Sequence, residues 1–175
     1  MSEQRIELGL LGWALRPWRA SDAAALQPLG NDERIARWMA DTWPMPYTEA
    51  DAAWWVNEGA ISTGDTWAIC LQDRPLGGCG VHWGQGFLRC NAEVGWWLSP
   101  DHWGQGIATQ AARQMVVRAL ANPEITRVMA PIHAGNSRSM RVAEKAGMAL
   151  EAVQPRSALK QGRVIDRHIY ASYRT

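Results

Sequence analysis

The sequence lacks several features that would place it in a specialised class. No apolar run reaches the length needed to cross a bilayer, so we expect neither a transmembrane helix nor a membrane partner. The net charge of +1 provides no overall attraction to nucleic acid, which is therefore not expected as a partner. The apolar segment 8–15 is bracketed by Glu7 and Arg16 and precedes no small-residue cleavage site, which favours a first strand over a signal peptide.

Cysteine is also scarce, with three residues that lie far apart and form no CxxC pair. Their odd number and their spacing argue against a disulfide framework and against a metal site, so no metal is expected. We interpret them as small buried side chains with reduced thiols, in a cytoplasmic protein. They are Cys70, Cys79 and Cys90.

The chain does contain enough apolar material for one folded core. Of its 175 residues, 47% are hydrophobic and 20% are charged, as in ordinary globular domains. Neither a linker nor a low-complexity segment interrupts it, so residues 1–175 are expected to form a single domain. Strand patterns alternate with helix patterns in mid-chain and follow one another at both ends. This order predicts an α/β or α+β fold, with a mixed sheet and helices on both faces. Strands are expected at residues 12–18, 66–71, 76–83, within 87–98, 126–132, 148–153 and 164–173.

Most of the expected helices begin at a capping residue. The caps are Ser21-Asp22 for residues 23–29, Asn31 for a second short helix, Thr48 for residues 49–58 and Asn136 for a helix ending near Ala146. Asp51 stands at capping-box distance from Thr48, and Gly147 is a C-terminal stop signal.

The most informative stretch, residues 93–120, combines a strand, a glycine loop and an amphipathic helix. The loop is Trp103-Gly104-Gln105-Gly106, and apolar residues recur at helical spacing from Ile107 onward. Backbone N–H groups at a helix start lack intrahelical partners, the helix dipole adds positive potential, and glycine allows a ligand to come close. We therefore interpret the loop as a pyrophosphate site. The same four letters occur at residues 83–86, but there they precede an expected strand at 87–90, which indicates a hairpin turn.

Three patches resemble the GNAT superfamily of N-acetyltransferases, and most closely its RimJ/RimL branch of ribosomal-protein α-amino acetyltransferases. Residues 92–109 are similar to the family's acetyl-CoA pyrophosphate loop and the strand before it. Residues 136–148 are similar to the branch's Asn-x-x-Ser…Glu-Lys-x-Gly-Phe pattern, with Met148 in place of phenylalanine. The third patch is residues 15–23, together with 162–166. Trp103 replaces the Gln or Arg of the wider superfamily, as is usual in this branch. No tyrosine in residues 136–147 matches the general acid of many members.

The resemblance implies a GNAT fold, with a mostly antiparallel sheet of about seven strands, and acetyl-CoA as co-substrate. It implies that the fourth and fifth strands splay apart and that pantetheine pairs with the backbone before the loop. It gives Asn136 a pantetheine amide contact and Ser139 a contact with the thiolate, and it implies a homodimer. The residues implied to bind the cofactor are Trp96, Trp97, Leu98, Trp103, Gly104, Gln105, Gly106, Ile107, Ala108, Thr109, Asn136 and Ser139.

Acyl transfer from a thioester to an amine needs a base for the amine and a proton for the leaving thiolate. Glu93 is the candidate base, through a water relay or as a more basic carboxylate, while an alternative role is only to orient the amine. Ser139 is the candidate acid or positioning donor. The equal alternative is that Ser139 is a serine in the first turn of the helix with no role in catalysis. His133 and His82 are weaker candidates for the base. No cysteine has an evident activating partner, so direct transfer in a ternary complex is expected.

Charge is unevenly distributed along the chain. Residues 31–65 contain seven acidic residues and two arginines, a net charge of −5, whereas residues 101–145 have a net charge of +3. The first segment suits a cationic amine and the second an anionic cofactor, although two unrelated solvated faces explain the pattern equally well. The acidic segment also carries Trp38, Trp43, Trp54 and Trp55, which are either walls of an amine pocket or core contacts.

The sequence thus predicts an N-acetyltransferase whose acceptor is a primary amine. A protein N-terminus and a small amine, such as a polyamine or an aminoglycoside, both remain open as acceptors. A non-catalytic acyl-CoA-binding or sensor domain on the same fold is the alternative. A P-loop nucleotide binder is disfavoured, because no Gly-Lys-Ser/Thr follows the glycine loop.

Overall fold

Most of the strands and helices that the sequence predicts form in the computed structural model, which describes residues 4–174. These residues fall into two units that interleave along the chain. One contains the residues up to Gly80 together with Trp96–Ala111, and the other contains Val81–Gly95 together with the residues from Ala112 onward. The chain passes from one unit to the other inside β4 (Arg74–Trp83), β5 (Asn91–Leu98) and α5 (Ile107–Ala121). A single domain over residues 1–175 stays a prediction.

The strands of the first unit follow the order β1-β2-β3-β4. β1 is Ile6–Glu7, β2 is Trp13–Arg16 and β3 is Asp65–Leu71. β2 pairs antiparallel with both β1 and β3, so that Leu15 lies opposite Ile69. All four residues of β2 are buried, which explains why Trp13, Ala14 and Leu15 form a continuous apolar run rather than an alternating one, and the strand ends in a buried charged residue, Arg16. The predicted first strand is confirmed.

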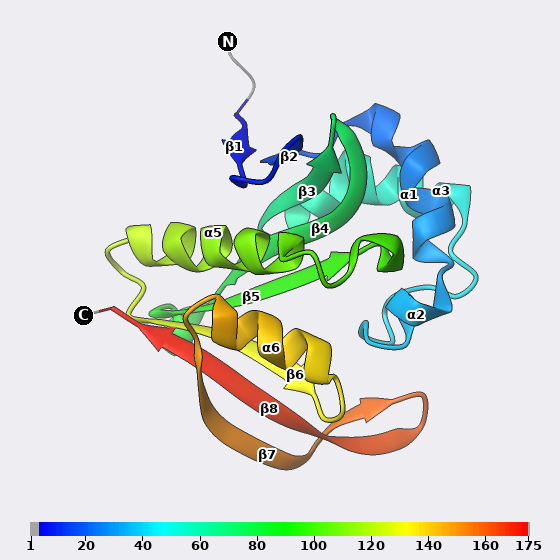
Figure 1. Cartoon of the computed structure of the whole chain (residues 1–175). Helices are drawn as coiled ribbons and strands as arrows, with labels where there is room; N and C mark the ends of the chain where they lie inside the picture. The colour runs from blue at the N-terminus through cyan, green and yellow to red at the C-terminus, as the bar shows by residue number, and fades with distance from the viewer. Residues whose placement is uncertain (1–3, 175) are drawn as a thin grey trace. The chain divides into compact units, whose positions relative to one another are not determined.

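The first unit also contains several short helices, and Figure 1 shows α1, α2 and α3 among them. They are η1 (Ala20–Asp22), α1 (Ala23–Gly30), α2 (Glu33–Ala36), α3 (Glu49–Trp54), the π-helical turn η2 (Trp55–Gly59), α4 (Ala60–Ser62) and η4 (Pro100–His102). Thr48 caps α3, and its hydroxyl and the Asp51 carboxylate form the predicted capping box. Beyond Trp54 the helix widens into η2, so residues 49–58 are helical but not uniformly α-helical.

Two predicted caps are wrong. Asp22 does not cap α1 with its side chain, because its carboxylate accepts hydrogen bonds from Arg16 and from the Arg19 amide. Asp32 rather than Asn31 caps α2, by accepting from the Arg34 amide. The Asn31 side chain instead bonds both the N–H and the C=O of Tyr47, sixteen residues away.

The strands of the second unit follow the order β5-β6-β8-β7. β6 is Arg127–His133, β7 is Ala149–Lys160 and β8 is Arg163–Tyr173. β6 is parallel to β5 and antiparallel to β8, which is antiparallel to β7. Helix α6 (Ser137–Lys145) packs against β6, β7 and β8, and buried residues alternate strictly along β6. Figure 1 shows this helix beside the long β7–β8 hairpin.

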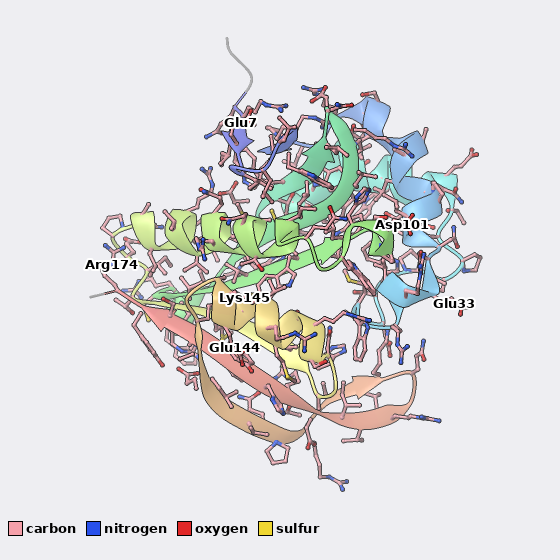
Figure 2. All side chains as sticks on the ribbon, in the orientation of Figure 1. Glu7, Glu33, Asp101, Glu144, Lys145 and Arg174 are labelled. Atoms are coloured by element: carbon pink, nitrogen blue, oxygen red, sulfur yellow. The ribbon has the colours of Figure 1, made fainter. Side chains whose placement is uncertain are left out.

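Both ends of α6 match the sequence prediction. Asn136 caps its start, and its C-terminus closes with hydrogen bonds from Gly147 N to Glu144 O and from Met148 N to Ala143 O, both 3.1 Å. Glu144 and Lys145 lie in the last turn (Figure 2), and the Glu144 carboxylate accepts from Tyr170 OH of β8. Arg174, beyond β8, donates from Nε to Ile125 O at 2.9 Å and so fixes the α5–β6 connection (Figure 2).

The second unit also corrects two strand predictions. Residues 87–90 form no strand, because Gly86–Leu88 is a 3-10 turn, η3, and β5 begins only at Asn91. The first Trp-Gly-Gln-Gly therefore begins a connection between β4 and β5 that is longer than a tight hairpin turn. A hydrogen bond from Gly84 N to Asn91 O joins the two ends of this connection. β7 extends to Lys160 instead of ending near Val153, so that the Gln161-Gly162 loop is a two-residue turn.

The predicted fold class is confirmed: the chain combines mostly antiparallel strands with flanking helices. Residues 4–174 contain eight strands, where about seven were expected, because the short β1 adds one at the start. Among those residues, no helix is both long enough and apolar enough to cross a membrane.

Candidate functional site

The glycine loop before α5 has the backbone of an open anion cradle. Gly104 and Gly106 have φ angles of +79° and +81°, which side-chain-bearing residues rarely adopt. A Cβ atom added at either position would meet no atom within 4 Å, so the backbone there faces open space. Within α5, Gln110 N bonds to Gly106 O at 3.0 Å, so the amides of Ile107–Thr109 precede the helical bonding pattern. The loop thus has the left-handed glycines, the open face and the helix start that suit a pyrophosphate.

The Trp103 side chain links this loop to the end of β5 by a hydrogen bond. Its Nε1 donates to the Leu98 carbonyl at 2.8 Å, while Ser99 N donates to Leu76 O at 2.7 Å. His102 stands edge-on against Trp13, with ring centroids 5.1 Å apart. The first unit therefore brings together all the predicted cofactor residues from Trp96 to Thr109.

Asn136 and Ser139 lie together at the start of α6 in the second unit. Asn136 Oδ1 accepts from the Ser139 amide at 3.2 Å, so the predicted N-cap is confirmed. Since the cap uses only Oδ1, the Nδ2 donor of Asn136 has no partner among the described residues and is available to a ligand. Ser139 is half-buried in the first turn of the helix. These two side chains offer an amide donor and a hydroxyl on one short stretch of backbone.

Glu93 occupies the last paired position of the parallel β5–β6 ladder. The ladder joins Asn91 to Arg127, Ala92 to Val128 and Glu93 to Met129, whereas β6 continues to His133. Within the second unit, Val94 and Gly95 therefore lie beyond the point where β5 and β6 pair, as the predicted splay requires. Ala92 and Val94 are buried, so the half-buried Glu93 lies on the opposite face of the strand.

The Glu93 carboxylate has no hydrogen-bond or ion-pair partner among residues 4–174. The nearby cation on the same face, Arg127, is already engaged by Asn91 Oδ1 at 3.0 Å and by Glu151 Oε1 at 2.8 Å. Arg127 and Tyr173 hold the pKa of the Glu151 carboxyl far below its usual range, at about 2. Arg127 is thus neutralised by Glu151, which leaves Glu93 available to a ligand.

Cys70 and Cys79 are poor nucleophile candidates. All three cysteines are free thiols. Burial raises the pKa of Cys70 to about 11 and raises the pKa of the fully enclosed Cys79 even further. Thiolate formation at neutral pH is therefore suppressed at both positions. No group of three or more metal-binding side chains occurs within the described part of the chain.

An aromatic cluster in the first unit includes residues that sequence reasoning missed. Trp18 and Trp97 stack with ring centroids 6.5 Å apart, and Trp55 meets Trp18 edge-on. Trp43 joins Trp97 to Tyr47. Of the tryptophans predicted as pocket walls, Trp43 and Trp55 belong to this cluster, Trp54 is 51% exposed, and Trp38 lies under the Arg37 guanidinium.

The sequence contained a signal for this cluster in Gly77-Gly78 of β4. A Cβ at Gly77 would lie 2.5 Å from Trp97 O, and one at Gly78 would lie 2.6 Å from Trp97 Nε1. Only glycines allow the end of β5 to approach β4 this closely.

Comparisons with known proteins agree with these features. A family model described as an acetyltransferase (GNAT) domain matches residues 13–149. The uncharacterized N-acetyltransferase YnaD of Bacillus subtilis (strain 168) is 22% identical over 157 residues, which cover 90% of this chain and 91% of that protein. The ribosomal-protein-serine acetyltransferase of Escherichia coli (strain K12) is 30% identical over 84 residues, 48% of this chain and 47% of that one.

A solved structure has a similar fold. It is that of RimL, a ribosomal L7/L12 α-N-protein acetyltransferase in complex with coenzyme A. The TM-score is 0.83 with 20% sequence identity, over 97% of this chain and 98% of that one.

Proposed function

Because the chain belongs to the GNAT family of acetyltransferases, we propose that it transfers the acetyl group of acetyl-CoA directly to a primary amine in a ternary complex. The observation that carries this proposal is the glycine loop at the start of α5. Its two left-handed glycines face open space and precede unbonded helix amides, as a pyrophosphate cradle requires. We assign the pyrophosphate contacts to residues 104–109, and the contact of the pantetheine arm to the backbone of Trp96, Trp97 and Leu98.

The start of α6 is assigned to the thioester end of the cofactor. Asn136 Nδ2 would donate to a pantetheine carbonyl while its Oδ1 keeps the helix cap. When the amine nitrogen attacks the thioester carbonyl, the C–S bond breaks and a thiolate leaves. The Ser139 hydroxyl would donate a hydrogen bond or a proton to that thiolate.

Glu93 is assigned to the acceptor amine. An amine arrives as an ammonium ion and must lose a proton before its nitrogen can attack. A half-buried carboxylate that has no partner within residues 4–174, at the last pair of the β5–β6 ladder, is suited to accept that proton directly or through water. His82 and His133 remain the alternative bases.

We favour a protein N-terminus as the acceptor over a small amine. The support comes from relatives, since both the E. coli relative and the RimL structure carry names of ribosomal-protein acetyltransferases. By the same resemblance we propose a homodimer. Three free cysteines support a reducing, cytoplasmic location. The alternative function is a non-catalytic acyl-CoA sensor on the same fold.

The test is an acceptor screen that follows release of free coenzyme A, with N-terminal peptides and small amines as acceptors. Calorimetry with acetyl-CoA, and with ATP as the comparison, measures cofactor binding separately. Selective acetyl-CoA binding together with amine-dependent release supports the proposal. If the protein binds acetyl-CoA but acetylates no amine, the sensor function replaces it.

The catalytic assignments are tested by Glu93→Gln and Ser139→Ala. We expect Glu93→Gln to lower kcat about a hundredfold or more without weakening acetyl-CoA binding. Glu124→Gln and Ser137→Ala are matched controls, because both side chains are exposed and have no assigned role. Unchanged coenzyme A release by both test variants would refute the assignments but not the transferase activity.

A further inference from the structure

Arg127 of β6 lies within reach of Glu93 of β5. On the parallel ladder of these strands Arg127 pairs with Asn91, and the next pair on the same face joins Met129 to Glu93. Successive pairs on one face lie about 7 Å apart along the strands. Arg127 Nη1 donates to Met129 Sδ at 3.1 Å, so the guanidinium already reaches the residue opposite Glu93. A guanidinium that was free to turn at this position would pair with the Glu93 carboxylate.

Among residues 4–174 no such pair forms, because the Arg127 guanidinium is engaged elsewhere. Nε donates to Glu151 Oε1 at 2.8 Å, and Nη2 donates to Glu151 Oε2. Nη1 donates to Asn91 Oδ1 at 3.0 Å as well as to Met129. The orientation of the Asn91 amide is fixed as well, since its Nδ2 donates to Leu88 O at 3.2 Å. The guanidinium is therefore held in one position beside Glu93 without bonding to it.

Glu151 reaches Arg127 from a bulge in β7. The register of β7 on β8 shifts between Leu150 and Ala152, so Glu151 is an extra residue of the strand. Bulges of this kind redirect a side chain and are frequent beside active sites. The Glu151 carboxylate also accepts from Tyr173 OH, and Tyr173 is the β8 partner of Arg127. Residues of β6, β7 and β8 thus form one cluster around the guanidinium.

Without Glu151, Arg127 would compete with the acceptor for Glu93. An acceptor amine arrives as an ammonium ion, and arginine remains a cation at every working pH. Both cations suit the same carboxylate, but Arg127 belongs to the chain and is always present. The Arg127 and Glu151 side chains are only 24% and 27% exposed, so solvent screens their charges less than at an open surface.

We propose that Glu151 is a positioning residue, which holds Arg127 away from Glu93 and so reserves the Glu93 carboxylate for the acceptor ammonium. The part of this inference that concerns the acceptor rests on the proposed function. Glu151 acts through Arg127 and takes no part in proton transfer itself.

The first test detects the competing ion pair and needs no substrate. Denaturant unfolding measures the effect of Glu93→Gln in two backgrounds, the native chain and Glu151→Ala. In the native chain the substitution should not lower the midpoint, because Glu93 has no partner within residues 4–174. In the Glu151→Ala background it should lower the midpoint, because Glu93 then pairs with Arg127. The same shift in both backgrounds would overturn the proposal.

Glu144→Ala provides a matched control background. Glu144 of α6 (Figure 2) also accepts from a tyrosine, Tyr170 OH, at 3.1 Å. Tyr170 and Tyr173 are three residues apart on β8 and therefore point to opposite faces of the sheet. Glu144→Ala changes the net charge as Glu151→Ala does, but it should leave the effect of Glu93→Gln as in the native chain. If Glu144→Ala gives the same shift as Glu151→Ala, the effect is one of net charge and the proposal fails.

The second test is kinetic and uses the peptide that gives the fastest release of coenzyme A in the acceptor screen. Glu151→Ala should lower kcat/KM for this peptide about tenfold, while KM for acetyl-CoA stays unchanged. The double variant Arg127→Met/Glu151→Ala lacks the competing cation and should recover most of the loss. If Glu151 served only stability, the double variant would be as slow as Glu151→Ala, and that result would overturn the proposal.

The two tests separate this inference from the proposed function. A midpoint shift that appears only without Glu151, in a protein that acetylates no amine, would support the role of Glu151 in holding Arg127 and refute the transferase. Acetyl transfer that does not change in Glu151→Ala would refute the role of Glu151 and leave the transferase in place.

Discussion

Arg16 and Asp22 form a buried, bidentate ion pair in the first unit. Arg16 Nη1 donates to Asp22 Oδ2 at 2.7 Å, and Nη2 donates to Oδ1 at 2.8 Å. The two side chains are 2% and 4% exposed. Arg16 also donates from Nε to Asp73 Oδ1 at 2.9 Å, so one guanidinium joins β2, η1 and the β3–β4 turn. The hydrogen bond to Asp22 raises the pKa of Arg16, which keeps its guanidinium charged.

Asp22→Ala should therefore destabilise the protein by about 3–5 kcal/mol, because it leaves a charged guanidinium buried without its main partner. Denaturant unfolding measures the loss as a lower midpoint. The double variant Arg16→Met/Asp22→Leu removes both charges and should recover much of the stability. A double variant as unstable as Asp22→Ala would contradict this explanation.

Stability should also fall in acid through Glu151. Its folded-state pKa of about 2 lies below its unfolded value, so the Arg127–Glu151 pair contributes stability above about pH 4.5. That contribution is lost as the pH falls towards 2. Because the pair is partly exposed, we expect it to be worth about 1 kcal/mol. The free energy of unfolding of Glu151→Gln should be lower than that of the native chain at pH 7. The difference should vanish near pH 2, and a constant difference across this range would refute the assignment.

The features that the sequence predicted correctly depend on interactions between residues close together in the sequence. The Thr48–Asp51 capping box, the Asn136 cap and the Gly147 stop all act within a few residues, and all three form as expected. The glycine loop before α5 is of the same kind, since its conformation depends on Gly104 and Gly106 themselves.

The predictions that failed concern residues whose roles depend on contacts with residues far away in the sequence. Asn31 has the side chain of a good cap, but it bonds the Tyr47 backbone, and Asp32 caps α2 instead. Gly77 and Gly78 lie within the strand expected at residues 76–83, but their role, which is to let Trp97 of β5 come close, was not predicted. The position of Glu93 at the last β5–β6 rung follows from strand pairing, which no local pattern around Glu93 encodes.

Gly106→Ala tests whether the second Trp-Gly-Gln-Gly binds the cofactor. Alanine at a φ of +81° should cost about 1–2 kcal/mol in stability, and the altered loop should weaken acetyl-CoA binding about tenfold. Gly86→Ala, in the first copy of the motif, is the matched control, with a φ of +57° and open space around its Cβ. It should lose comparable stability while binding acetyl-CoA normally in calorimetry. Equal losses of affinity would mean that the loop acts only through folding.

Gly78→Ala tests the aromatic cluster. The added methyl group would lie 2.6 Å from Trp97 Nε1 and 3.1 Å from Trp18 Cζ2, so the stacked rings must move apart. Overpacking of this kind costs about 1–3 kcal/mol, and unfolding followed by tryptophan fluorescence measures it. Gly95→Ala is the control, because a Cβ at Gly95 meets nothing within 4 Å and should leave stability nearly unchanged. If Gly78→Ala is as stable as Gly95→Ala, close packing of Trp97 on β4 does not hold the cluster together.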